Sequence, residues 1–143
     1  MKLYTYGISG KSAEQFFETI KSSGANKILD TRINRSSQLA GFAKDRDLSY
    51  FSKNLAHIDY EIAPYLAPTK QLLKDYRDGK IDWSHYSSQY LQLIRDRKVE
   101  NTLPSILDNS IFLCSEDSPI YCHRRLAAEY LAHQIPGTSI IHL

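Results

Sequence analysis

The residues best suited to chemistry lie in one short segment near the C-terminus, residues 114–125. It holds thiols at Cys114 and Cys122, a carboxylate at Glu116 and the run Cys122-His123-Arg124-Arg125. Thiols act as nucleophiles or metal ligands, imidazole and carboxylate groups transfer protons, and guanidinium groups bind anions. An apolar run before this segment and helical apolar spacing after it predict a strand, a loop and a helix start. In α/β proteins, ligands commonly bind at such a place.

Cys122 is a candidate nucleophile. It is predicted at a helix N-terminus beside His123 and Arg124, a setting that lowers the pKa of a thiol. The alternative is that Cys122 forms a wall of the site, and burial is the expectation for Cys114. The spacing does not fit phosphatase-like or rhodanese-like loops, because Ala128 stands where such a loop needs an arginine.

Metal binding is disfavoured by spacing. Cys114, Cys122 and His123 are three possible ligands, with Glu116 or His142 as a fourth. Seven residues separate the two cysteines, whereas zinc ligands are commonly separated by roughly two to four. The adjacent Cys122 and His123 would also be awkward to bring to one ion. The sequence therefore predicts no metal and no cofactor.

A second polar group follows a predicted strand at 26–30. Asp30 and Arg32 are two residues apart, so in an extended chain their side chains point the same way and a structural ion pair is one expectation. The other is a functional pair, with Asp30 as a catalytic base or ribose-hydroxyl acceptor and Arg32 as an anion contact. Glu116 is the second candidate acid or base. Alternatively, Glu116 caps its loop or pairs with Arg124.

Anion binding is the chemistry that the sequence favours most. Arg124 falls in the first turn of a predicted helix, where free N–H groups and the helix dipole attract phosphate. Arg32, His123, Ser9 and Ser36 are the other predicted anion or substrate contacts. The chain has ten tyrosines, and six of them offer faces on which a base could stack: Tyr6, Tyr50, Tyr60, Tyr65, Tyr86 and Tyr90.

Strands are predicted at 3–6, 26–30, 59–62, 111–114 and 139–143, and helices at 12–23, 45–55, 70–76, 83–97, 101–107 and 124–133. Residues 31–44 form a polar, basic loop. This alternation predicts a single α/β domain over 1–143, with three layers and a mostly parallel central sheet flanked by helices. Because ligands of parallel sheets bind beyond the carboxyl ends of the strands, the polar residues after three strands are expected to meet at one edge.

The bulk composition is that of an ordinary globular domain. Hydrophobic residues make up 42% and charged residues 24% of 143 residues. No signal peptide is recognisable, and no apolar run approaches the about 20 residues of a membrane helix. With two cysteines, a disulfide framework is not expected and reduced thiols in the cytoplasm are.

The chain also resembles a known family. The residues that carry the likeness are Tyr4-Thr5-Tyr6-Gly7-Ile8-Ser9, Phe16, Leu29-Asp30-Thr31-Arg32, Ser36, Phe42, Leu113-Cys114-Ser115-Glu116, Cys122-His123-Arg124 and Ile141-His142-Leu143. With them the chain is similar, over essentially its whole length, to the domain of unknown function 488 family. It departs from that family at Ile8, Thr31 and Asn34, where His, Val and Pro are usual. The resemblance implies a fold and a site but no reaction.

Three functional hypotheses follow. The first is an enzyme acting on a nucleotide or nucleic acid, by hydrolysis or transfer at a phosphate or glycosidic bond. The second is a module that binds a nucleotide or nucleic acid without turnover. The third is a polar network that stabilises the core of a domain whose function lies on a partner. A formal net charge of +2 favours a phosphate-bearing small molecule or a nucleic-acid end over a long duplex.

Overall fold

The computed structural model describes residues 1–36 and 41–143, and within them five strands form one parallel sheet. The strands are β1 (Lys2–Gly7), β2 (Lys27–Asp30), β3 (Asp59–Ile62), β4 (Ser110–Cys114) and β5 (Ser139–His142). The helices are α1 (Ala13–Ser23), α2 (Asp45–Leu55), α3 (Lys70–Arg77), α4 (Trp83–Asp96), α5 (Pro104–Leu107) and α6 (His123–Gln134). In the part of the chain so described, we find no helix with the length and apolar character needed to span a membrane.

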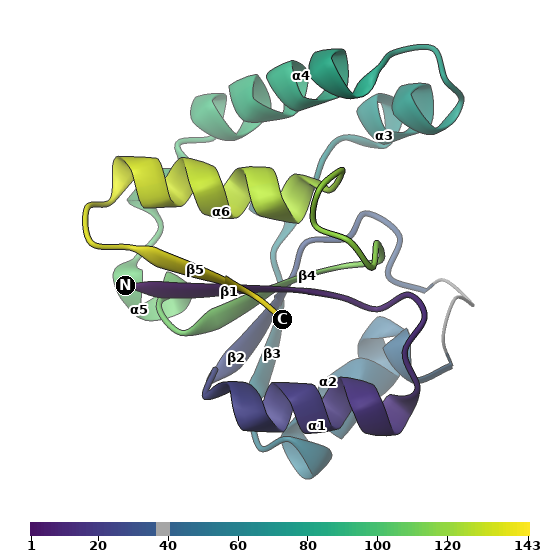
Figure 1. Cartoon of the computed structure of the whole chain (residues 1–143), viewed down its shortest axis with the longest axis vertical. Coiled ribbons are helices and arrows are strands. Elements are labelled where there is room, and N and C mark those ends of the chain that lie inside the picture. The colour runs from purple at the N-terminus through teal and green to yellow at the C-terminus, as the bar shows by residue number, and fades with distance from the viewer. Residues whose placement is uncertain (37–40) are drawn as a thin grey trace.

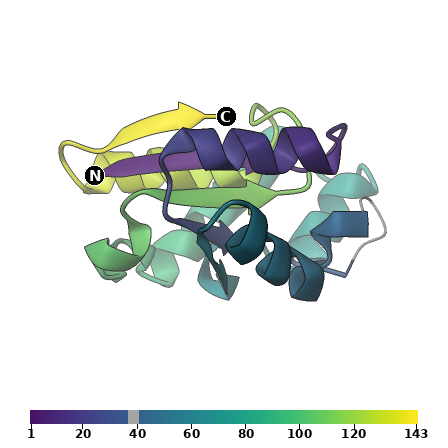
Figure 2. The same cartoon turned by 90° about the horizontal axis from the view of Figure 1, so that it is seen from below.

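The sheet lies between two groups of helices, which confirms the three-layer α/β prediction (Figure 1). Helices α1 and α2 cover one face and lie next to each other in the view from below (Figure 2). Helix α6 covers the other face, with α4 packed on α6 and α3 packed on α4. The strand order is β3-β2-β4-β1-β5.

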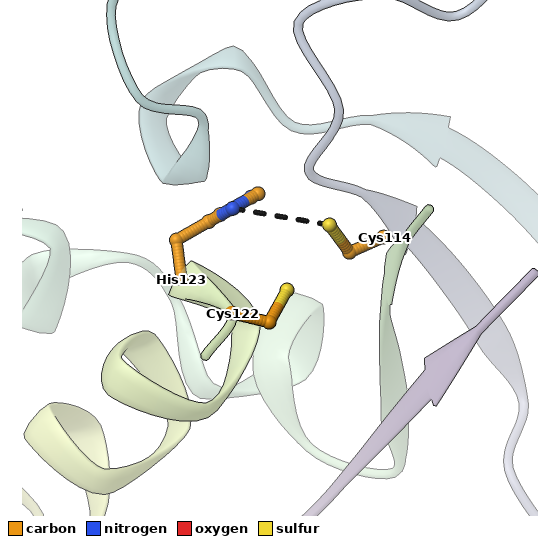
Figure 3. A group of neighbouring side chains, drawn as sticks. All are labelled: Cys114, Cys122 and His123. Atoms are coloured by element: carbon orange, nitrogen blue, oxygen red, sulfur yellow. Dashed lines mark hydrogen bonds between the residues drawn. The ribbon is translucent and has the colours of Figure 1, made fainter. Parts of the chain in front are cut away.

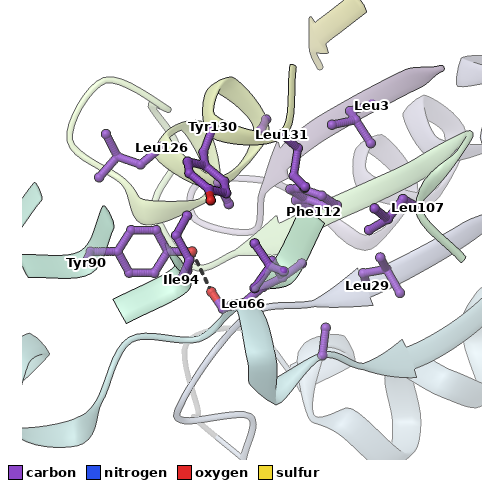
Figure 4. Packing of buried hydrophobic residues seen from close by; sticks show 14 of the residues in the cluster. Leu3, Leu29, Leu66, Tyr90, Ile94, Leu107, Phe112, Leu126, Tyr130 and Leu131 are labelled. Carbon is purple, nitrogen blue, oxygen red and sulfur yellow. Dashed lines mark hydrogen bonds between the residues drawn. The ribbon is translucent and has the colours of Figure 1, made fainter. Parts of the chain in front are cut away.

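Two apolar cores follow from the alternation of side chains along the strands. Leu3, Leu29 and Phe112 face the side of α6 and α4, where Figure 4 shows them packed with residues of those helices. Their neighbours in sequence face α1 and α2 instead, among them Tyr4 and Ile28. Both faces of the central strands are therefore buried, as a parallel sheet requires.

Local sequence signals fix several element ends. Ser12 and Gln15 form the predicted capping box at the start of α1, and Gly24 ends that helix with a left-handed φ of 83°. The helix predicted at 101–107 is present but shorter than predicted. A 3₁₀ turn at Val99–Asn101 precedes α5, which starts at Pro104, because proline keeps the preceding residue extended. A second 3₁₀ turn, Gly41–Ala43, interrupts the predicted loop at 31–44; residues 37–40 of that loop lie outside the described residues.

The topology brings the ends of β2 and β4 together. Asp30 pairs in register with Leu113, so Thr31 lies beside Cys114, and the backbone N–H of Thr31 donates to Leu113 O over 3.0 Å. The chain leaves β2 toward α2 on one face and leaves β4 toward α6 on the other. Such a divergence opens a crevice at the carboxyl edge of the sheet, where ligands of α/β proteins bind.

Candidate functional site

A pocket lies at this carboxyl edge, bounded by the segments after β2 and β4 and by residues of α3 and α4. Its empty volume is ≈ 550 Å³ when the open solvent at its mouth is included, and the space that the centres of water-sized molecules can occupy is ≈ 70 Å³. Its wall combines three kinds of groups: a cluster of two thiols and an imidazole, a set of aromatic rings, and charged side chains near the mouth.

Cys114, Cys122 and His123 form what we call the thiol–imidazole cluster (Figure 3). Cys114 is the last residue of β4, Cys122 is the N-cap of α6 and His123 is the first residue of that helix. The two sulfur atoms and a ring nitrogen of His123 lie within 4.8 Å of one another, and His123 Nδ1 is 3.8 Å from Cys114 Sγ. All three side chains are buried and line the pocket.

This placement overturns the spacing argument against a shared ion. Cys122 has an extended backbone (φ −135°, ψ 139°) just before the helix begins, so it and the adjacent His123 both reach toward Cys114. The seven intervening residues form a loop that returns the chain to the end of β4. The cluster could therefore hold a metal ion through three ligands. Of the two fourth ligands considered, Glu116 lines the pocket, whereas His142 lies on β5 with Nδ1 2.6 Å from Thr5 Oγ1.

Thr31 orients the imidazole of His123. His123 Nε2 lies 2.9 Å from the backbone oxygen of Thr31 and 2.9 Å from its Oγ1, while that hydroxyl donates to Leu113 O over 2.7 Å. A carbonyl oxygen only accepts, so Nε2 carries a hydrogen. Nδ1 is then the ring nitrogen that faces Cys114. Thr31 was not among the predicted site residues.

The electrostatics of the two thiols correct the prediction for Cys122. A hydrogen bond from the Cys122 thiol, aided by the charge of His123, holds the pKa of Cys114 well below its ordinary value despite burial. Burial, and then the sharing of that hydrogen bond with Cys114, raise the pKa of Cys122 well above its ordinary value. Of the two thiols, Cys114 is the one whose pKa is lowered.

Aromatic rings form one wall of the pocket. Tyr76 and Tyr86 have ring centroids 4.8 Å apart, and Tyr86 stacks on Trp83 at 5.4 Å. Tyr121, on the loop before Cys122, is 62% exposed and meets the Trp83 ring edge-on at 5.5 Å. Among the six tyrosines proposed for stacking, Tyr86 lines this pocket. Tyr76 and Tyr121 were missed, because nothing in the sequence shows that α3 packs beside the loop after β4.

Charged groups lie near the mouth. Arg77, at the end of α3, and Glu116, on the loop after β4, are exposed and line the pocket. Arg32 also lines it but is buried, and its Nε and Nη2 donate to Asp30 at 2.9 and 2.7 Å. Two predicted site residues, Arg32 and Glu116, are thus brought together with the cluster.

Asp30 does not reach the pocket. It is fully buried, and its carboxylate accepts from both Arg32 and the hydroxyl of Tyr60. Burial lowers the pKa of Arg32, but the hydrogen bond and charge of Asp30 outweigh burial, so the pKa is raised. The structural ion pair is therefore the alternative that the structure supports, since no lone pair of Asp30 is presented to a ligand.

Arg124 and Ser9 hold the loop after β4 instead of facing the pocket. Arg124 is 1% exposed, and its Nη1 and Nη2 donate to the backbone oxygens of Glu116 and Asp117. The N–H of Ser9 donates to Ser115 O over 3.0 Å. At Gly7 a Cβ atom would stand 1.8 Å from Glu116 O, so β1 and this loop touch backbone to backbone. The anion contacts predicted for Arg124 and Ser9 are replaced by support of the loop.

Ser36 lies on the surface beside the main pocket. It is exposed and lines a separate hollow with Asn34, Arg35, Asp45 and Lys70. Arg35 Nε is 3.6 Å from Asp45 Oδ2 there. Asn34 lines both hollows, so Ser36 borders the main pocket without facing the thiol–imidazole cluster.

Comparisons with known proteins give a family but no chemistry. A family model described as domain of unknown function DUF488 matches residues 12–131. No curated protein and no solved structure matches the chain. The matched span contains both polar strand ends and the whole thiol–imidazole cluster. Because the match extends over most of the 143 residues, the chain belongs to the DUF488 family of domains of unknown function.

Proposed function

We propose that this protein is an enzyme that acts on a nucleotide, free or at an accessible position of a nucleic acid. The reaction is hydrolysis or transfer at a phosphate or glycosidic bond. One observation carries the proposal: a single pocket combines aromatic faces, arginines and a buried group of thiols and imidazole.

The aromatic wall suits a planar base. Tyr121 is exposed at the mouth, and Tyr76 and Tyr86 continue the wall inward. Stacking of a base on such a ring is worth about 1–3 kcal/mol and tolerates any base. The wall therefore supports recognition of a nucleobase without fixing which one.

The charges at the mouth suit a phosphate. Arg77 is exposed, and no ion pair is formed by it within the described residues. Arg32 already forms an ion pair with Asp30. Arg77 is therefore the principal anion contact of this proposal. A guanidinium binds phosphate through paired, charge-assisted hydrogen bonds.

Glu116 is the acid or base of the proposed reaction. It is the carboxylate that lines the pocket, whereas Asp30 is enclosed by its own partners. The scissile bond would lie between Glu116 and the thiol–imidazole cluster, with the base toward the tyrosines. Both cysteines are free thiols, which agrees with the reducing cytoplasm as the proposed location.

Binding is tested by calorimetry with nucleoside mono- and diphosphates, inorganic phosphate and short single-stranded oligonucleotides. We expect Arg77→Met to weaken binding of the phosphorylated ligands about tenfold, the loss of one exposed charge-assisted contact. Tyr121→Ala should weaken binding of nucleotides but not of inorganic phosphate. Arg46→Met is the matched control, because Arg46 is exposed and lines a different hollow. Equal affinities in all four proteins, or no binding at all, would overturn the proposal.

Turnover is tested by following the bound nucleotides by phosphorus NMR and chromatography. Glu116→Gln should abolish product formation while binding persists. Tight binding to the wild-type protein with no product from any ligand would instead establish the non-catalytic binding module.

A further inference from the structure

We propose that the thiol–imidazole cluster is a Zn²⁺ site, with Cys114 Sγ, Cys122 Sγ and His123 Nδ1 as ligands and a fourth position open to the pocket. Nothing in the family assignment provides a metal, and the sequence spacing argued against one. The inference rests on where the fold places these three side chains.

The distances fit a tetrahedral ion. With Zn–S near 2.3 Å and Zn–N near 2.0 Å, two ligand atoms of a tetrahedral site lie about 3.5–3.8 Å apart. Cys114 Sγ and His123 Nδ1 are 3.8 Å apart, and no two ligand atoms exceed 4.8 Å. Closing the largest gap takes a relative movement of about 1 Å between the ligand atoms.

The surroundings of His123 match those of a metal ligand. A ligating histidine almost always donates its other ring N–H to a carboxylate, a backbone carbonyl or water. His123 Nε2 is held in this way by the backbone oxygen and hydroxyl of Thr31, both at 2.9 Å. This contact leaves the lone pair of Nδ1 free to bind a metal ion, and it fixes the ring so that Nδ1 faces both sulfur atoms.

The donor set selects the metal. Two sulfurs and one imidazole nitrogen are soft or borderline ligands, which favour Zn²⁺ over Mg²⁺ or Ca²⁺. All three ligands are buried yet line the pocket, so an ion has a path of entry. Within the described residues no fourth histidine, cysteine or carboxylate joins the group. Three protein ligands with one open position is the arrangement of catalytic zinc.

The ion would complete the proposed reaction as a hydrolysis, and this step rests on the proposed function. Bound Zn²⁺ lowers the pKa of its water to about 7. Glu116 takes the proton from that water, and the resulting hydroxide forms a bond to phosphorus or to the anomeric carbon. The bond to the leaving group breaks with its electron pair, and Glu116 returns the proton to the leaving atom. No electrons are transferred and no second reactant is needed besides water.

Zinc binding is measured on reduced protein that has been stripped with a chelator and dialysed. We expect one Zn²⁺ per chain by elemental analysis, and a Co²⁺-loaded protein with thiolate-to-cobalt absorption in the near ultraviolet. Cys114→Ser and Cys122→Ser should each lower Zn²⁺ affinity by more than about 100-fold, beyond the range of changes made outside the ligand set. His85→Gln is the control, because His85 is exposed on α4, outside the cluster.

Circular dichroism of each variant shows whether it is folded, and His123→Gln gives a third, independent ligand change. Stoichiometry well below one, or Zn²⁺ affinity that is the same in wild type and all three ligand variants, would overturn the zinc site. The two proposals fail separately. Nucleotide binding to zinc-free protein tests the pocket alone, and Arg77→Met should lose nucleotide affinity while keeping its Zn²⁺.

Discussion

The ends of β2 and β4 lie side by side and are both rich in polar residues, yet they differ in what satisfies those residues. At the end of β2, Asp30 and Arg32 satisfy each other, with Tyr60 as a third partner. At the end of β4, Cys114 lies beside Cys122 and His123, and all three line the pocket. The first group is enclosed by its own partners, whereas the second lines a pocket.

The difference teaches how to separate a structural polar group from a functional one. Asp30 accepts hydrogen bonds from Arg32 and Tyr60, so adding a ligand would cost it an existing hydrogen bond. In the thiol–imidazole cluster, the potential metal-ligand atoms face one another, and a hydrogen bond to the backbone oxygen of Thr31 orients the imidazole. Residue type alone does not distinguish these cases, because a carboxylate and a guanidinium are as capable of catalysis as a thiol.

The largest effect on stability is expected from removing one partner of the buried Asp30–Arg32 ion pair. Asp30→Ala leaves Arg32 as an unpaired buried charge and should lower the free energy of unfolding by about 3–5 kcal/mol. Chemical denaturation measures it, with Asp59→Ala on the neighbouring strand as the exposed control. A stable Asp30→Ala protein that has lost only activity would reverse the comparison and make Asp30 the functional group.

The next effect is expected from Arg124, which supports the loop after β4. Arg124→Met leaves two loop carbonyls without their donor and should cost about 1.5–3 kcal/mol of stability. The adjacent Arg125→Met is the control, since Arg125 pairs with Glu129 on the surface at 3.4 Å. If Arg124→Met instead kept full stability and lost phosphate affinity, the anion contact predicted from sequence would be right.

A comparable or slightly smaller effect is expected at Gly7. A Cβ there would lie 1.8 Å from Glu116 O, so Gly7→Ala must push the loop after β4 away from β1. We expect a loss of about 1–3 kcal/mol, as for other overpacked sites, together with weaker ligand binding. Gly41→Ala is the control, because a Cβ at Gly41 meets nothing within 4 Å. Wild-type thermal stability of Gly7→Ala would show that the loop does not depend on this contact.

The smallest effect is expected at Thr31, which joins the two strand ends. Thr31→Val removes the hydroxyl that contacts His123 and Leu113 but keeps the backbone oxygen that orients the imidazole. We expect a loss of about 0.5–1.5 kcal/mol in stability and a change in Zn²⁺ affinity below about tenfold. Thr31→Ser keeps the hydroxyl and should behave as wild type. A Thr31→Val protein with no Zn²⁺ affinity would mean that the hydroxyl, not the carbonyl, orients His123.

Much of the fold could be predicted from local signals. The helix at Asp45–Leu55 lies where its apolar spacing places it, because Leu48 on that spacing is buried. The strand at Asp59–Ile62 also lies where it is predicted, although its residues are exposed or half-buried. Ser12 and Gly24 mark the ends of α1 through hydrogen bonds and a φ angle that depend on adjacent residues. The exception near residue 101 has a local cause too, the proline at 104.

The sequence could predict which strand ends carry the candidate site but not which side chains line a pocket there. From residue types and periodicity alone, polar side chains are expected after β2 and β4, and parallel strands place them at one edge of the sheet. Which of these side chains face a pocket depends on how the elements pack in three dimensions. Sheet register set Thr31 beside Cys114, an extended backbone at Cys122 brought its thiol and His123 toward Cys114, and the packing of α3 brought Tyr76 and Arg77 to the same wall. The partners of each side chain depend on distances between segments that are far apart in the chain, and a local sequence pattern does not contain those distances.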